Sequence, residues 1–150
     1  MSDYKIEELS AATIVAVNKL GLKPGQEQFV SPVSYAAVAA VTTPESAWQR
    51  VVLDGDRVVG FIHGHFDDEA SEDHFKAALW RINVDATVQG EGVGTFAVNA
   101  LLDEARKRGL DRVTVIYEPG DAGPEQFFLN VGFAPIGETQ YGETIGAFTL

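Results

Sequence analysis

A glycine-rich stretch is the part of this sequence whose residue types and spacing point most directly to chemistry. Residues 89–95 read Gln-Gly-Glu-Gly-Val-Gly-Thr. Glycines at alternate positions let successive backbone N–H groups point into one concavity. An amphipathic pattern typical of a helix follows, and the first N–H groups of a helix attract anions at the same place. The stretch therefore predicts a cradle for a phosphorylated ligand.

Two nucleotide-binding motifs compete for these glycines. Gly92-x-Gly94-x-x-Ala97 formally satisfies the dinucleotide fingerprint, with Glu118 as the acid that would bind the ribose. Its context is unfavourable, because Asp85 to Val88 separate the glycines from the preceding strand and few residues follow to complete a doubly wound sheet. A dinucleotide-binding domain is thus the less favoured alternative. A Walker-type loop is excluded, since no Lys-Ser or Lys-Thr pair follows the glycines.

Two histidines form a second group with chemical potential. His63 and His65 lie two residues apart in a strand-like run, so their side chains belong on one face of that strand. Histidine is the usual general base near neutral pH, although a hydrogen-bonded or surface histidine explains the pattern as well. A metal site formed with His74 and the acidic residues 67–74 is a weaker interpretation, because His-x-His alone is a weak pattern. We expect no metal.

A mixed α/β fold must position these residues. Helical patterns cover Ser10–Leu20, with Ser10 as the cap, Ser34–Val41, Gly94–Arg108 and Pro124–Asn130. Strand patterns cover Arg50–Leu53, Arg57–Phe66, Ala77–Val84, Arg112–Tyr117, Phe133–Glu138 and Glu143–Thr149. Asp54-Gly55-Asp56 predicts a hairpin turn between the first two strands. We therefore expect antiparallel strands first and one parallel βαβ unit in the middle.

Composition limits the setting. A chain of 150 residues with 45% apolar residues is long enough for one core, so we expect a single domain over residues 1–150. The net charge of −11 disfavours nucleic acid and suits small cationic molecules. Without cysteine there is neither a disulfide nor a thiolate metal site. The N-terminus lacks a secretory signal and no apolar run is long enough to span a membrane, so a cytoplasmic protein is expected.

Two motifs carry a resemblance to a known family. Gln89-x-x-Gly92-x-Gly94, after the strand at residues 79–84, resembles the acetyl-CoA pyrophosphate motif of the GNAT family of N-acetyltransferases. Phe127-Phe128-x-x-x-Gly132-Phe133 is similar to the F-Y-x-x-x-G-F motif that closes this fold, and residues 119–125 resemble a variant common in bacterial members. The resemblance covers Val51 to Leu150. Residues 25–32 are similar to the bacterial diamine/spermidine acetyltransferase branch.

The resemblance implies a cosubstrate, acetyl-CoA, and the residues that bind it. It also implies a mostly antiparallel sheet with helices on both faces. The pyrophosphate would be held by the backbone amides of Gln89, Gly90, Glu91, Gly92, Val93, Gly94 and Thr95. The strand edge formed by Ile82, Asn83 and Val84 would pair with the pantetheine arm, and one N–H would polarise the thioester carbonyl. The cofactor would be bordered by Asp121, Pro124, Phe127 and Phe128, although for Phe127 a plain core position is the favoured interpretation.

The implied reaction is direct acetyl transfer to a primary amine of a small cationic molecule, such as a polyamine, in a ternary complex. The resemblance also implies a homodimer, as in many relatives. The chain departs from the family at two places. Trp80 stands where polyamine-acetylating relatives often carry an acidic residue, and Phe128 stands where their tyrosine acid lies. A non-catalytic acetyl-CoA-binding module or sensor is therefore the alternative function.

The missing acid and base leave other side chains as candidates. His63 and His65 are the nearest replacements for the base. The sequence alone does not place the further candidates, which are Glu27, Glu118, Tyr117 and Tyr141. Arg81 matches a recurrent family position and is explained equally well by an ion pair.

Overall fold

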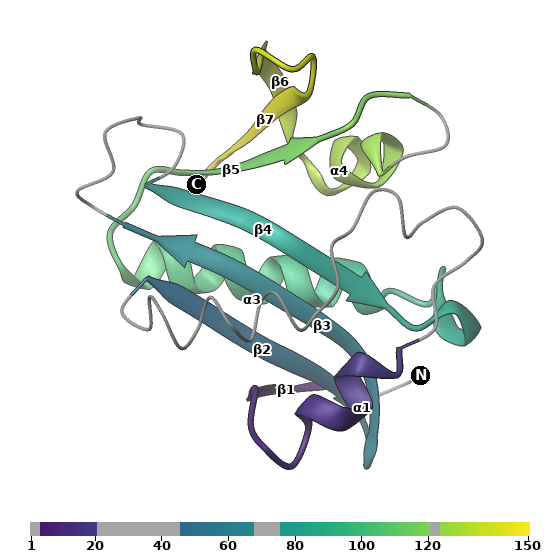
Figure 1. Ribbon diagram of the computed structural model, residues 1–150. Coiled ribbons are helices and arrows are strands. Elements are labelled where there is room, and N and C mark those ends of the chain that lie inside the picture. Colours follow the sequence, from purple (N-terminus) through teal and green to yellow (C-terminus); the bar gives the residue numbers. More distant parts are fainter. Residues whose placement is uncertain (1–3, 21–45, 68–75, 121–123) are drawn as a thin grey trace.

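The computed structural model describes residues 4–20, 46–67, 76–120 and 124–150. In these parts seven strands form one sheet in the order β1-β2-β3-β4-β5-β7-β6 (Figure 1). Their bounds are β1 Tyr4–Glu8, β2 Ala47–Asp54, β3 Arg57–Phe66, β4 Ala77–Val84, β5 Arg112–Tyr117, β6 Ala134–Glu138 and β7 Thr144–Thr149. The helices are α1 Ile14–Asn18, α3 Val93–Lys107 and α4 Glu125–Val131, with a 3-10 turn, η3, at Ala86–Val88. The helix expected at 34–41, His74 and Asp121 lie outside the described residues.

The sheet is mixed. Neighbouring strands run antiparallel except β4 and β5, which are parallel and joined by the crossover helix α3. This confirms the expected mostly antiparallel α/β fold with a single βαβ unit. A parallel pair needs such a crossover because a short turn cannot return the chain to the same end of the sheet.

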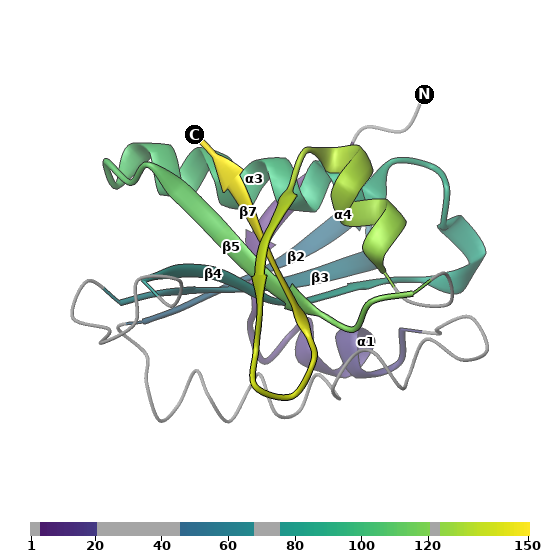
Figure 2. The same ribbon diagram turned by 90° about the horizontal axis from the view of Figure 1, so that it is seen from above.

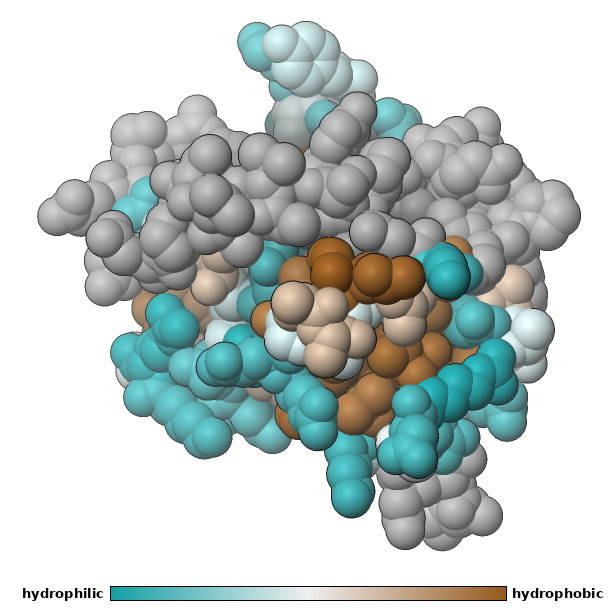
Figure 3. Space-filling view, turned by 60° about the horizontal axis from the view of Figure 1, so that its bottom comes forward, coloured by the Kyte–Doolittle hydropathy of each residue, from teal (hydrophilic) through white to brown (hydrophobic). Residues whose placement is uncertain are grey.

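Helices cover both faces of the sheet, as expected. In Figure 2, α3 and α4 lie on one side of the strands and α1 lies on the other. The larger apolar core lies between the sheet and α3, and Ala97, Leu101 and Ala105 are buried there as the helical periodicity predicts. A smaller cluster under α1 contains Val17 and Phe61. Apolar side chains gather in the middle of the molecular surface seen in Figure 3, and hydrophilic residues border them.

The first turn of α3 is fixed to β3 by a close approach. A Cβ atom at Gly60 would lie 2.9 Å from Cγ1 of Val93, the first residue of α3. Only glycine at this point of β3 lets the start of α3 pack so close to the sheet. The end of the glycine loop, where α3 begins, therefore packs directly on β3.

The N-terminal part differs from the expectation. The helix expected over Ser10–Leu20 is only Ile14–Asn18, and Thr13, with no side-chain cap bond, replaces Ser10 as its N-cap. Its β-branched residues have low helix propensity, so only the segment that buries Val17 stays helical. Strand β1 was not expected, and β2 begins three residues before the predicted Arg50. No helix among the described residues is long and apolar enough to cross a membrane.

Candidate functional site

The glycine loop adopts a backbone that only glycine tolerates well. Gly90 has φ of 86° and Gly92 has φ of 89°, both in the left-handed region. No atom lies within 4 Å of a Cβ built at either glycine, so conformation and not space requires them. Gly92 is the N-cap of α3, and its carbonyl accepts the N–H of Phe96 at 3.0 Å. The N–H groups that follow, in the first turn of α3, are those a helix leaves without an intrahelical acceptor.

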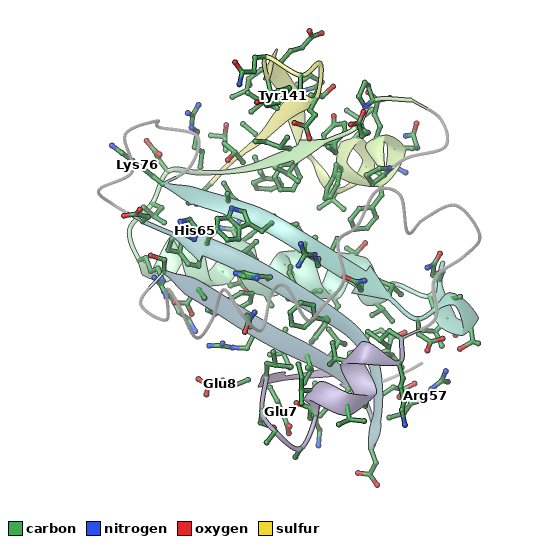
Figure 4. The ribbon with its side chains drawn as sticks, viewed as in Figure 1. Glu7, Glu8, Arg57, His65, Lys76 and Tyr141 are labelled. Carbon is green, nitrogen blue, oxygen red and sulfur yellow. The ribbon has the colours of Figure 1, made fainter. Side chains whose placement is uncertain are left out.

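Side chains fix the approach to this loop. The carboxylate of Asp85 accepts the N–H of Thr87 at 2.9 Å and so caps η3. Arg57, labelled in Figure 4, contacts that carboxylate at 3.5 Å and donates to the Thr87 hydroxyl at 2.6 Å. Gln89 donates from Nε2 to the carbonyl oxygen of Val84 at 2.9 Å. The loop is therefore tied to the end of β4.

The edge of β4 that faces away from β3 has no partner strand among the described residues beyond Leu79, and we call it the open edge. Pairing with β5 consists of Ala78 with Thr114 and Leu79 with Val115, and no described strand pairs with the following residues of β4 on that side. The two strands therefore separate at the point where the resemblance places the pantetheine arm.

Backbone direction along this edge follows from two hydrogen bonds. The N–H of Asp85 donates to Val59 at 2.9 Å, on the β3 side. Because backbone groups alternate in direction along a strand, those of Ile82 and Val84 point away from β3, and those of Asn83 point toward it. The bond from Gln89 to the Val84 carbonyl agrees with this direction. Ile82 and Val84 therefore present N–H groups at the open edge, whereas the backbone N–H of Asn83 faces β3; Asn83 stays a sequence-based candidate for the donor site.

A β-bulge places Trp80 beside the open edge. The register of β4 with β3 passes from Leu79 opposite Gly64 to Arg81 opposite His63, so Trp80 is the extra residue. Its side chain is 46% exposed. The indole stacks on His65, with ring centroids 4.2 Å apart and planes 7° apart, and its centroid is 5.1 Å from that of His63. Figure 4 shows His65 beside β4.

The structure brings the two predicted histidines together on one face, but in different environments. His63 is 1% exposed, and its Nδ1 lies 3.3 Å from Nε2 of Gln49. Burial, then the charges of Arg81 and His65, lower the pKa of His63 to about 4. Burial also lowers the pKa of His65, and the carboxylate of Asp67 opposes that shift. His63 is therefore neutral at pH 7 and a weak base.

The pKa of His63 predicts a loss of stability in acid. Between pH 6.5 and 4 the unfolded chain binds a proton at His63 that the folded protein does not bind. The free energy of unfolding therefore decreases as the pH is lowered through this window, and protonation of His63 has no effect on it at higher pH. After discounting for solvent screening, we expect a loss of about 1 to 2 kcal/mol between pH 7 and 5. Urea unfolding of wild type and His63→Gln at both pH values measures it. An equal loss in both proteins would contradict the assignment, and His65→Gln is the control for the neighbouring imidazole.

Metal ligands do not gather in the described part of the chain. Across residues 4–20, 46–67, 76–120 and 124–150, no three histidine, aspartate or glutamate side chains are close enough together to hold an ion.

Aromatic residues of α4 pack between the first turn of α3 and strand β5. A Cβ built at Gly94 would lie 3.0 Å from Cε1 and Cζ of Phe127, so Phe127 packs on the first turn of α3. Phe128 is 3% exposed and stacks on Tyr117 at 5.4 Å. Phe128, which stands where the resemblance places a tyrosine, is therefore a core residue in this structure. Pro124 is the N-cap of α4.

Two hydroxyl groups near the site follow from the fold and not from any motif. The Tyr117 hydroxyl is buried with no hydrogen-bond partner, and burial, followed by the charge of Glu125, raises its pKa. Tyr4 donates from its hydroxyl to the carbonyl oxygen of Glu91, within the glycine loop, at 2.9 Å. No local sequence pattern signals the second contact, because it joins residues 87 positions apart.

Comparison with known proteins assigns this arrangement to a family. Residues 22–133 match the model of the Acetyltransferase (GNAT) family. L-2,4-diaminobutyric acid acetyltransferase of Streptomyces coelicolor is 30% identical over 87 residues, which cover 57% of this chain and 49% of that protein. Mycothiol acetyltransferase of Beutenbergia cavernae is 34% identical over 65 residues, which cover 43% of this chain and 22% of that protein. The chain thus spans about half the length, or less, of these relatives.

Solved structures share the whole fold at low sequence identity. The PaiA N-acetyltransferase of Thermoplasma acidophilum, solved with coenzyme A, superimposes with a TM-score of 0.75 at 13% identity over 99% of both chains. The ribosomal-protein-S18-alanine N-acetyltransferase of Escherichia coli gives a TM-score of 0.72 at 18% identity over 98% of this chain and 94% of that chain. The chain belongs to the acetyltransferase (GNAT) family, which confirms the resemblance and the fold expected from the sequence.

Proposed function

We propose that residues 1–150 form a single domain that transfers an acetyl group from acetyl-CoA to the primary amine of a small cationic molecule, such as a polyamine. The observation that carries the proposal is the open edge of β4, which presents the N–H groups of Ile82 and Val84. The hydrogen bond from Gln89 to the Val84 carbonyl holds the glycine loop next to the end of this edge. A donor with an amide-rich arm and a pyrophosphate matches both parts. The two curated relatives are named for small acceptors, diaminobutyric acid and mycothiol.

The donor would lie along this edge as an added strand. Its pyrophosphate would accept hydrogen bonds from backbone N–H groups of residues 89–95, where the glycines and the start of α3 concentrate donors. Its pantetheine arm would pair with Ile82 and Val84. Phe127, packed on Gly94, and Pro124 would border it, and Phe128 would support Phe127 from the core through their ring contact at 5.2 Å. Asp121 stays a sequence-based candidate.

The reaction needs a neutral amine and a stabilised oxyanion. The amine nitrogen attacks the thioester carbonyl carbon, and a β4 N–H stabilises the negative oxygen. The C–S bond then breaks, coenzyme A leaves as the thiolate, and the proton released from the amine nitrogen neutralises that thiolate. An amine of pKa about 10.4 is mostly charged at pH 7, which costs roughly 4 to 5 kcal/mol. His63, with a pKa of about 4, recovers little of this, so desolvation of the amine is the main contribution we propose.

Trp80 is the side chain that we propose to contact the acceptor. It lies on the bulge beside the thioester position, and His65 covers one face of its indole while the side chain stays 46% exposed. The π-face of tryptophan attracts cations, by about 0.5 to 2 kcal/mol depending on exposure. An acidic residue at this position in relatives would attract the same charge.

Replacement of Trp80 with alanine is expected to raise the KM for the acceptor about tenfold without changing coenzyme A affinity. Trp80→Phe keeps an aromatic face and is expected to lie between alanine and wild type. Steady-state kinetics with the best amine and calorimetry with coenzyme A measure the two quantities. An unchanged KM in Trp80→Ala would remove Trp80 from the acceptor site.

The direct test of the proposed function is a thiol-release assay with acetyl-CoA and a panel of polyamines, diamines and amino acids carrying a second amine. Amine-dependent release of coenzyme A that rises with pH supports the enzyme. The second candidate is a non-catalytic acetyl-CoA sensor, favoured by the absence of a hydroxyl on Phe128, which stands where relatives carry their acid. Binding of acetyl-CoA in calorimetry without turnover of any amine at any pH would favour the sensor.

Several expectations stay predictions within this proposal. They are the cytoplasmic location, the homodimer, and the absence of nucleic-acid and membrane partners. His63 and His65 also stay predictions as general bases.

A further inference from the structure

Strand β1 reaches the glycine loop through one side chain. Tyr4, the first residue of β1, pairs with Asp54 of β2, and its hydroxyl donates to the carbonyl oxygen of Glu91 at 2.9 Å. Its ring lies 5.7 Å from that of Phe96, in the first turns of α3. The ring contact and the hydrogen bond hold Tyr4 against both sides of the junction between loop and helix.

The hydrogen bond to Glu91 has a consequence for the next residue. In a trans peptide the carbonyl and the following N–H point in opposite directions. Fixing the carbonyl of Glu91 therefore fixes the N–H of Gly92, the N-cap of α3. Gly92 needs this restraint, since a glycine in the left-handed region adopts many other conformations at little cost.

We infer that Tyr4 is a positioning residue for the donor site: its hydroxyl keeps the Glu91–Gly92 peptide turned so that the Gly92 N–H faces the pyrophosphate. The inference rests on the proposed function, because it assumes that the loop binds coenzyme A. Tyr4 does not touch the donor. The Tyr4 hydroxyl orders the loop in the free protein, so that less conformational entropy is lost when the donor binds.

Replacement of Tyr4 with phenylalanine tests the inference, because it removes the hydroxyl and keeps the ring on Phe96. Calorimetry is expected to show coenzyme A affinity reduced about three- to tenfold, the size of one net hydrogen bond. Affinity for pantetheine, which lacks the pyrophosphate, is measured by ligand-observed NMR and is expected to stay unchanged. Tyr141→Phe is the matched control for coenzyme A affinity: the sequence offers Tyr141 only as an acid or base for the acceptor, not as a donor-binding residue, and it is 80% exposed at the tip of the β6–β7 hairpin (Figure 4).

The outcomes separate the inference from the function on which it rests. Wild-type affinity for coenzyme A in Tyr4→Phe, or an equal loss for pantetheine, overturns the positioning role. A loss of thermal stability in Tyr4→Phe with unchanged coenzyme A affinity shows a purely structural tyrosine and also overturns it. A wild-type protein that binds no coenzyme A contradicts the proposed function itself.

Discussion

Replacing Gly92 with valine is expected to weaken coenzyme A binding by at least about a hundredfold, or about 3 kcal/mol, while the protein stays folded. Gly92 has φ of 89°, which a β-branched residue adopts only with strain. The loop would relax toward another backbone conformation and misdirect its N–H groups. Each hydrogen bond to a charged group contributes about 1.5 to 3 kcal/mol, so the loss of two explains the expected effect.

Gly55 supplies a matched control for this strain. It lies in the β2–β3 turn with φ of 63°, and like Gly92 it has no atom within 4 Å of a built Cβ. Gly55→Val is expected to lower the free energy of unfolding by about 1 to 3 kcal/mol, as we expect for Gly92→Val, and to leave coenzyme A affinity unchanged. Calorimetry and urea unfolding on both variants separate the two effects. Retained coenzyme A affinity in Gly92→Val would refute the cradle.

Replacing Ile82 with proline is expected to lower the rate of acetyl transfer about a hundredfold to a thousandfold. Proline removes the N–H that points to the open edge of β4, and loss of one oxyanion donor typically has this effect. The β3–β4 ladder keeps its hydrogen bonds, because that N–H does not face β3. A thiol-release assay at saturating acetyl-CoA measures the rate.

Asn83 supplies the opposite case one residue away. Its backbone points toward β3, so Asn83→Pro removes a ladder hydrogen bond and is expected to destabilise the protein by about 1 to 3 kcal/mol more than Ile82→Pro. If Ile82→Pro retains the wild-type rate while folded, the Ile82 N–H is not the oxyanion donor. If the two variants are equally destabilised, the assignment of backbone direction is wrong.

The middle of the fold was predictable because its signals are local. Strands β3, β4 and β5 begin and end at the residues that the sequence pattern predicts. Helix α3 begins and ends one residue earlier than expected, at Val93 and Lys107, and Gly109, with φ of 77°, follows its end as expected. These signals are tight turns, alternating apolar residues and a long amphipathic period. Each involves residues that are close in the sequence, so each can be recognised from the sequence alone.

The remaining features depend on contacts between distant residues. Strand β1 has only five residues and is stabilised by β2, which begins 39 residues after β1 ends, so no local pattern announces it. The low pKa of His63 follows from its burial beside Gln49 of β2 and Arg81 of β4. The bulge at Trp80 exists only in the pairing of β4 with β3. The glycine motif predicts the proposed donor loop from the sequence alone, whereas the proposed contact of Trp80 with the acceptor depends on the three-dimensional structure.

Amide hydrogen exchange of the protein with and without coenzyme A tests the central claim most directly, since the proposed donor site consists mainly of backbone N–H groups. The proposed site predicts that coenzyme A slows exchange at Ile82, Val84 and residues 90–95. Asn83, already bonded toward β3, is expected to change little and serves as an internal control. Protection elsewhere in the chain, or no protection at saturating coenzyme A, would contradict the donor site.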